Sequence, residues 1–97
     1  MKVSVHPGAD QDLSDAFRFY GREAGAGVAR RFPDEFGRVA WLLNEFPDLG
    51  TLTGDDRRTY PLTGFPYSVI YRQTDTELRV LVLRHQSRSP NHGGARS

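Results

Sequence analysis

Residues 57–90 read RRTYPLTGFPYSVIYRQTDTELRVLVLRHQSRSP, and this stretch decides the fold. It contains three runs rich in β-branched and aromatic residues, at 57–62, 67–73 and 78–84, which short turn-forming segments separate. The pattern predicts three strands in meander order. In the last run we expect Val80 and Val82 to face one side of the sheet and Leu81 and Leu83 the other. A strand that is apolar on both faces is typical of a central position under helices.

The first part of the chain predicts a strand followed by a helix. Residues 2–6 alternate with period two, as a half-buried strand does, and His6 with Pro7 is expected to cap the turn that follows. From Ala9 onward, apolar residues recur at helical spacing on one face. The run Gly-Ala-Gly at 25–27 is expected to stop this first helix.

A second helical stripe begins at Val28 and ends near residues 46–50. Pro33 lies within it, and because proline has no N–H donor we expect a kinked but continuous helix there. Residues 51–56 are expected to form a polar loop. The resulting order β-α-α-β-β-β predicts an α+β fold, in which a helical hairpin packs on one face of a small, mostly antiparallel sheet.

Length and composition predict one soluble domain over residues 1–97, with a frayed tail at 89–97 that buries little. The chain has no cysteine, which excludes disulfides and thiolate zinc sites and suits a cytoplasmic location. No apolar run approaches the roughly 20 residues that a membrane span requires. No histidine pair has metal-ligand spacing and no glycine-rich phosphate loop is present, so we expect neither a metal nor a cofactor.

The charges are distributed unevenly. Residues 1–50 carry six cations against eight acids, whereas residues 51–97 carry seven arginines against four acids. Arginine is protonated at any relevant pH, which makes it a poor general base and a good partner for anions. A rim that carries Arg84, His85 and Arg88 therefore suits an anionic or acidic partner. An unevenly charged, solvated surface is the other reading that the composition leaves open.

Several strings resemble, in order and spacing, the toxins of bacterial type II toxin–antitoxin pairs, the RelE/ParE superfamily. They are VSVHPGADQDL at 3–13, FY at 19–20, RF at 31–32, FPDLG at 46–50, FPYSVIY at 65–71 and RHQSRSP at 84–90. The resemblance covers residues 3–92. It implies the fold described above and a cognate antitoxin protein as partner.

The superfamily includes ribosome-dependent endoribonucleases, the RelE-like members, and non-hydrolytic poisons of DNA gyrase, the ParE-like members. The resemblance places the two lysines of RelE-like enzymes at Thr59 and Pro61 and one of their arginines at Ser68. Arg88 matches a second arginine, and His92 stands where those enzymes carry a tyrosine. The ribonuclease set is therefore mostly missing, because threonine and proline neither take a proton nor neutralise a phosphate. A slip of one or two residues would bring Arg57 or Arg58 nearer to the set.

A different ribonuclease arrangement is open by the same resemblance. Some members use a histidine just after the last strand together with a glutamate and an arginine. His85, Glu45 and either Arg58 or Arg88 would supply that set here, and histidine is the natural base at neutral pH. His85 is otherwise a structural residue, a partner contact or an exposed side chain.

The spacing His-x-x-Arg-x-Pro after the last strand resembles the ParE-like branch. This branch implies that the chain binds DNA gyrase without cutting a bond. Arg84, His85 and Arg88, with Arg58, are the expected target contacts. The alternatives are a RelE-like enzyme that acts on the ribosome and mRNA, and an inactive binding module of the same fold.

The antitoxin is expected to lie along the helical hairpin and the sheet. Exposed apolar parts of Val28, Phe32 and Trp41 are the expected contacts, although Trp41 is also a candidate for packing in the core. A dimer, or a heterotetramer with the antitoxin, is compatible with this expectation.

Overall fold

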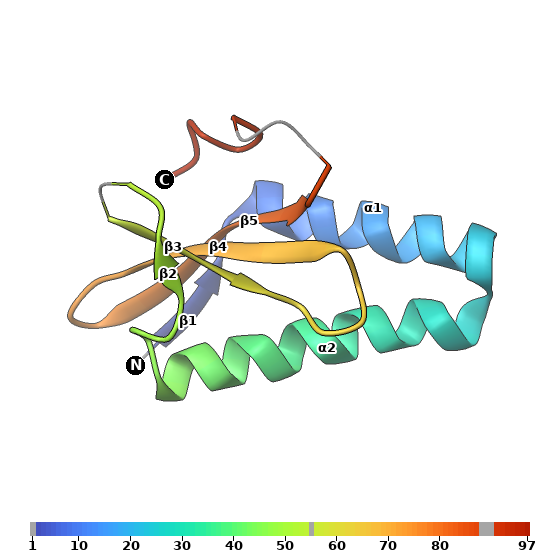
Figure 1. Cartoon of the computed structure of the whole chain (residues 1–97), viewed down its shortest axis with the longest axis horizontal. Helices are drawn as coiled ribbons and strands as arrows, with labels where there is room; N and C mark the ends of the chain where they lie inside the picture. The colour runs from blue at the N-terminus through green and yellow to red at the C-terminus, as the bar shows by residue number, and fades with distance from the viewer. Residues whose placement is uncertain (1, 55, 88–90) are drawn as a thin grey trace.

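The computed structural model describes residues 2–54, 56–87 and 91–97. Two helices pack on one face of a five-stranded sheet of order β1-β5-β4-β3-β2 (Figure 1). The edge strand β1 runs parallel to β5, and the other neighbours are antiparallel. The predicted α+β fold with a mostly antiparallel sheet is thus confirmed. Its elements are β1 (Lys2–Val5), α1 (Pro7–Ala24), α2 (Ala26–Glu45), β2 (Thr51–Leu52), β3 (Arg57–Pro61), β4 (Tyr67–Gln73) and β5 (Glu77–His85).

The two helices begin and end close to the predicted points. The side chain of His6 accepts a hydrogen bond from the Gly8 N–H at 2.9 Å, which confirms the predicted cap of α1. Gly25 alone separates the helices, with a φ of 90° that favours glycine, so Ala26 already belongs to α2 and the predicted three-residue stop was too long. The second helix continues through Pro33, as predicted. Within the described ranges neither helix has an apolar stretch that could cross a lipid bilayer.

The predicted polar loop at residues 51–56 was partly wrong. Thr51 and Leu52 form the short strand β2, whose residues pair with Thr59 and Arg58 of β3. A strand of two residues has no periodicity that a sequence pattern can reveal. Its pairing with Thr59 and Arg58 supplies hydrogen-bond partners to the outer edge of β3, which would otherwise be unpaired there.

The main core lies between the helices and the sheet. Phe32 of α2 is fully buried, and its ring lies 4.9–5.5 Å, between centroids, from those of Tyr20, Phe65 and Tyr67. Aromatic pairs of this kind add about 0.5–1.5 kcal/mol each to the burial term. The remaining buried members of this cluster are Ala9, Ala16, Val39, Leu43, Leu62, Val69, Tyr71, Leu78, Val80 and Leu83.

A β-bulge in β5 changes which side chains face the helices. Ile70 pairs with Val82 and Tyr71 with Val80, so Leu81 is an extra residue on β5. Val82 and Leu81 consequently join Ile70 in a second buried cluster on the face away from the helices. The predicted alternation, with Val80 and Val82 on one side, was therefore wrong. The prediction that β5 is central and buried on both faces is confirmed, since β1 and β4 flank it.

Candidate functional site

The face of the sheet away from the helices carries a row of arginines. Arg57, Arg72 and Arg79 are direct cross-strand neighbours on β3, β4 and β5. We call this surface, with Ile70, Val82 and Arg84, the open face. Like charges directly opposite one another destabilise a sheet. The partners of these arginines offset part of this repulsion: Arg57 donates to carbonyls of residues 93–96, Arg79 donates to Ser97 O and Ser4 Oγ, and Arg72 lies 3.9 Å from Asp56.

The positions that the RelE-like resemblance singles out also lie on the open face. Pro61 is opposite Ser68, Ser68 is opposite Arg84, and Thr59 is opposite Ile70. The positions are thus adjacent, as the resemblance implies. None of the three side chains at Thr59, Pro61 and Ser68 titrates near neutral pH, so these positions cannot shuttle a proton.

Residues 91–97, which we call the strap, lie over the open face on the side of the sheet opposite α2 (Figure 1). Arg57 of β3 donates hydrogen bonds to the main-chain carbonyls of Gly93 at 3.3 Å, Gly94 at 3.1 Å and Arg96. Gly93 has a φ of 75°, and a Cβ there would lie 2.5 Å from Val82 Cγ2. The expectation that this part of the chain buries little was therefore wrong for residues 91–97. Glycine at position 93 lets the strap approach Val82 closely, and the hydrogen bonds from Arg57 hold the strap there.

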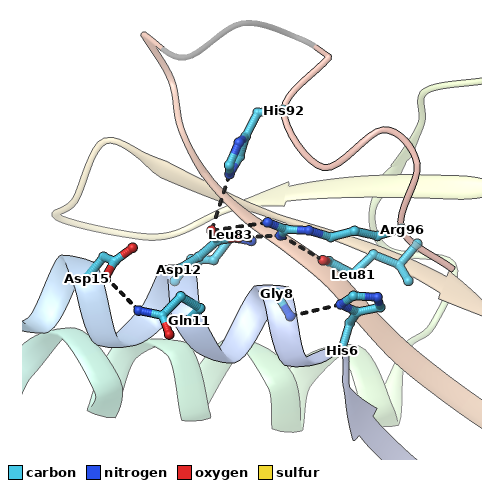
Figure 2. A network of polar contacts seen from close by, with 9 residues as sticks. All are labelled: His6, Gly8, Gln11, Asp12, Asp15, Leu81, Leu83, His92 and Arg96. Atoms are coloured by element: carbon cyan, nitrogen blue, oxygen red, sulfur yellow. Dashed lines mark hydrogen bonds and ion pairs between the residues drawn. The ribbon is translucent and has the colours of Figure 1, made fainter.

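Asp12 of α1 anchors the strap (Figure 2). Its Oδ2 accepts from Arg96 Nη1 at 2.6 Å and from the Leu83 N–H at 3.1 Å, and His92 Nε2 lies 3.2 Å from Oδ1. Arg96 Nη1 also donates to the carbonyl of Leu81, the bulged residue, at 3.1 Å. Only 11% of the Asp12 side chain and 19% of the Arg96 side chain are exposed. No sequence pattern predicts this pair, because Asp12 and Arg96 are 84 residues apart.

A cleft of about 360 Å³ lies between the strap and the segment that joins β2 to β3. Arg57, Arg84 and His92 line it, over a floor formed by Ile70 and Val82. These two floor residues are 4% and 1% exposed. Next to such an apolar floor, interactions between charges are stronger than in bulk water. The cleft also contains the exposed carboxylate of Asp56 in its rim.

The sequence pattern that defines the family described as "ParE toxin of type II toxin-antitoxin system, parDE" matches residues 3–90. The chain belongs to the ParE toxin family. The resemblance drawn from the sequence is thereby confirmed, and it is confirmed for the ParE-like branch.

Two relatives and one solved structure agree with this assignment. Toxin ParE2 of Mycobacterium tuberculosis, from strain CDC 1551 / Oshkosh and from strain ATCC 25618 / H37Rv, is 29% identical over 90 residues. The alignment covers 93% of this chain and 86% of each relative. The solved structure titled "Chromosomal ParDE TA system from P. aeruginosa" has a TM-score of 0.78 at 19% identity and covers 88% of this chain and 95% of that chain. At that identity the likeness shows the fold.

In this ParE-family chain, His85 lies on the helix side of the sheet and not on the open face. Its ring packs edge-on against Tyr67 with 5.0 Å between ring centroids. Its Nδ1 accepts the Ser87 N–H at 3.0 Å and lies 2.7 Å from Ser87 Oγ. Arg84 and His85 point to opposite faces because neighbouring strand residues alternate. Arg88 lies outside the described residues.

Arg58 stabilises the loop between α2 and β2. Its guanidinium donates to the carbonyls of Gly50 at 2.7 Å and Asp48 at 3.1 Å. Beside it, the Tyr71 hydroxyl donates to the Pro47 carbonyl at 2.6 Å and accepts from the Gly50 N–H at 3.0 Å. Burial raises the pKa of Tyr71, which keeps the hydroxyl neutral in both bonds. Arg58 therefore has a structural role in the toxin fold.

The described members of the second ribonuclease set, His85, Glu45 and Arg58, lie apart, and Arg88 is outside the described residues. Arg58 is opposite Tyr71 and His85 is opposite Tyr67, four residues away along β4 and therefore roughly 13 Å apart. Glu45 ends α2 and lies about 20 Å along that helix from Phe32, which packs on Tyr67. The three residues are therefore far apart along the backbone, and the Arg58 guanidinium binds the carbonyls of Gly50 and Asp48.

The expected antitoxin contacts fall into two environments. Phe32 is 0% exposed, so the expectation that it offers an apolar part to a partner was wrong. Val28 is half-buried at the mouth of a groove of about 550 Å³ that Tyr20 and Phe65 also line. Trp41 is 62% exposed, because it lies two residues from Val39 and so on the opposite side of α2. The alternative of core packing for Trp41 is excluded.

Glu35, at the rim of that groove, ties α2 to the turn between β3 and β4. Its two carboxylate oxygens accept from Arg38 Nε and Nη2, both at 2.7 Å, and one of them also accepts the Thr63 N–H at 2.6 Å. The hydrogen bonds from Arg38 lower the pKa of Glu35 below its ordinary value, and the Thr63 N–H adds to this against the effect of burial.

The contribution of Glu35 to the free energy of unfolding should decrease as the pH falls into the acid range. A carboxyl group whose pKa is lower in the folded state stabilises the fold above the unfolded pKa, about 4.3, and loses this contribution as pH falls through the folded value. The free energy of unfolding of the wild-type toxin should therefore exceed that of Glu35→Gln at about pH 7 and approach it at about pH 3. Urea unfolding at both pH values measures the gap. A gap of constant size would contradict the assignment.

Proposed function

We propose that this toxin acts in the cytoplasm by binding DNA gyrase without cutting a bond, and that a cognate antitoxin neutralises it. The observation that carries the proposal is the chemistry of the open face. It has arginines at the positions where an anion or an acidic partner can bind, and threonine, proline and serine at Thr59, Pro61 and Ser68. RNA cleavage needs one group that takes a proton and another that donates one, and arginine serves poorly as either.

The proposed target contacts are Arg84 on the open face and His85 and Arg88 at the end of β5 and beyond. Arg84 lines the cleft beside the strap, where its interaction with a partner's acidic group would be stronger than in bulk water. Arg58 is the weakest member of this set, because carbonyl oxygens of the loop between α2 and β2 already accept from its guanidinium. The proposed antitoxin contacts are Val28 and Trp41 on α2.

The test uses purified toxin and purified gyrase. The toxin should inhibit supercoiling of relaxed plasmid or trap the cleaved complex, and it should leave messenger RNA intact on translating ribosomes. Arg84→Ala should raise the half-inhibitory concentration about tenfold, because a desolvated charge contact is worth more than about 1.4 kcal/mol.

Arg22→Ala is the matched control for this test, since Arg22 is an exposed cation in the last turn of α1. It removes the same charge and should leave inhibition unchanged. Cleaved messages together with full gyrase activity would replace the proposal by the ribonuclease alternative. Equal effects of Arg84→Ala and Arg22→Ala would remove the open face from the target contact.

A further inference from the structure

The cations of the open face, of which the gyrase proposal uses Arg84, also form a track across the strands. Neighbouring strands are about 4.8 Å apart, so the row Arg57, Arg72 and Arg79 extends over roughly 10 Å. At its β3 end the track enters the cleft beside the strap, where Arg84 and His92 contribute. Phosphates along one nucleic-acid strand repeat about every 3.4 Å of axis, so the row is long enough to face about three of them.

The contacts of Arg57 hold its guanidinium in place without neutralising it. Its partners are the main-chain carbonyls of Gly93, Gly94 and Arg96. Carbonyls are dipoles, so within the described part of the chain the charge of Arg57 is not offset by a carboxylate. Arg96 differs, because Asp12 pairs with it at 2.6 Å. The strap thus holds Arg57 in place through its carbonyls. The positive charge of Arg96 is offset by Asp12 and adds little to the charge of the cleft.

Arg79 donates to Ser97 O at 3.2 Å and to Ser4 Oγ at 3.1 Å, and the acidic groups that the structure describes near the track compensate it weakly. Asp56 lies 3.9 Å from Arg72, at the limit of an ion pair, and 61% of its side chain is exposed. Glu77 is beside Lys2 at the β1 edge. An ion pair as exposed and as long as that of Asp56 with Arg72 contributes little. Guanidinium groups, unlike ammonium groups, match phosphate oxygens with two parallel hydrogen bonds.

A phosphate backbone needs no apolar anchor, so the distribution of exposed apolar side chains suits a nucleic acid as an occupant of the arginine row, in addition to the contact proposed for gyrase at Arg84. Protein interfaces are centred on buried aromatic or aliphatic anchors. In the described residues, the large exposed apolar side chains belong to the helices, to the loop after α2 and to strand positions whose partners face the helices. They are Val3, Val5, Phe17, Phe19, Trp41, Phe46, Leu49 and Leu52. The open face offers cations without such anchors.

We propose that the open face binds the sugar–phosphate backbone of nucleic acid, with one phosphate in the cleft between Arg57 and Arg84 and its neighbours along Arg72 and Arg79. Binding is independent of sequence because the track reaches phosphates and not base edges. It is an activity of the toxin alone and does not depend on contact with gyrase.

The test is fluorescence anisotropy of the full chain with a labelled duplex DNA of about 20 base pairs, at about 50 and 200 mM salt. The dissociation constant should fall in the range of about 10⁻⁴–10⁻⁶ M that is usual for backbone binding. The slope of log K against log salt should be roughly −3, which corresponds to about 0.9 for each of three to four phosphates. Labelled single-stranded DNA and RNA show whether the form of the backbone matters.

Two matched double variants locate the site. Arg72→Ala with Arg84→Ala should weaken binding about tenfold and make the slope shallower by about two, roughly one for each lost phosphate contact. Arg18→Ala with Arg22→Ala removes the same charge from α1 and should leave both unchanged. Circular dichroism confirms that both variants are folded.

Three results would overturn the inference: no binding of any of the three probes, equal losses in the two double variants, or equal competition by polyglutamate, which would indicate an acidic protein. Gyrase inhibition is a separate readout. Inhibition by a toxin without DNA affinity removes this inference alone, whereas DNA affinity without inhibition removes the gyrase proposal alone.

Discussion

Replacement of Phe32 by alanine is expected to lower the free energy of unfolding by about 3–5 kcal/mol. The ring is 0% exposed and lies within 5.5 Å, centroid to centroid, of three other aromatic rings. The helix and the sheet cannot both close onto the space that the ring leaves, so the loss of packing adds to the loss of burial. Urea unfolding followed by circular dichroism measures the change.

Trp41→Ala is the matched control because Trp41 belongs to the same helix and is 62% exposed. Its stability should change by no more than about 0.5 kcal/mol. Antitoxin affinity should fall at least about tenfold, because exposed tryptophans that become buried on binding are frequent hot spots. If Phe32→Ala kept its stability and lost antitoxin affinity, Phe32 would be a partner contact after all.

Replacement of Asp12 by alanine is expected to cost about 3 kcal/mol. The change removes the acceptor of Arg96 Nη1 and of the Leu83 N–H, and it leaves a guanidinium that is only 19% exposed without its carboxylate. Loss of one partner of a buried ion pair costs about 3–5 kcal/mol, and an unsatisfied N–H costs about 1–3 kcal/mol. The residual exposure of the pair places the expected value at the lower end.

Asp15→Ala is the control for Asp12→Ala, since Asp15 pairs with Arg18 at the surface with 57% of its side chain exposed. It should change stability by less than about 1 kcal/mol. A double-mutant cycle with Arg96→Ala measures the coupling directly. Hydrogen exchange adds a local readout: the Leu83 amide should lose protection in Asp12→Ala more than amides of β3. An unchanged urea midpoint in Asp12→Ala would show that the strap does not depend on this pair.

Much of the fold could be predicted because its signals are local and periodic. The meander β3-β4-β5 follows from three β-rich runs separated by turn residues, and the helices follow from apolar stripes. The stripe through Val28, Phe32 and Val39 in fact predicts Phe32 as a core residue. Phe32 was placed at the surface only because part of its ring was also expected to contact the antitoxin. Trp41 does not belong to this apolar stripe, because it lies on the other side of α2 from Val39.

The remaining features could not be predicted because they depend on contacts between distant residues. The bulge at Leu81 lies in an apolar run without glycine, and one extra residue moves Val82 to the other face. The open face became visible only when the register placed Arg57, Arg72 and Arg79 side by side. The candidate target residues were predicted as one rim, whereas strand alternation separates Arg84 from His85.

The parallel pairing of β1 with β5 has a consequence for how the toxin arises during translation. Arg79 and Ser4 are bonded across 75 positions, and Asp12 and Arg96 across 84. Local hairpins can form as they leave the ribosome, but β1 can pair with β5 only after residues 77–85 have emerged, and Asp12 can pair with Arg96 only later. A nascent polypeptide therefore lacks the arginine row and its cleft until these residues have been synthesised.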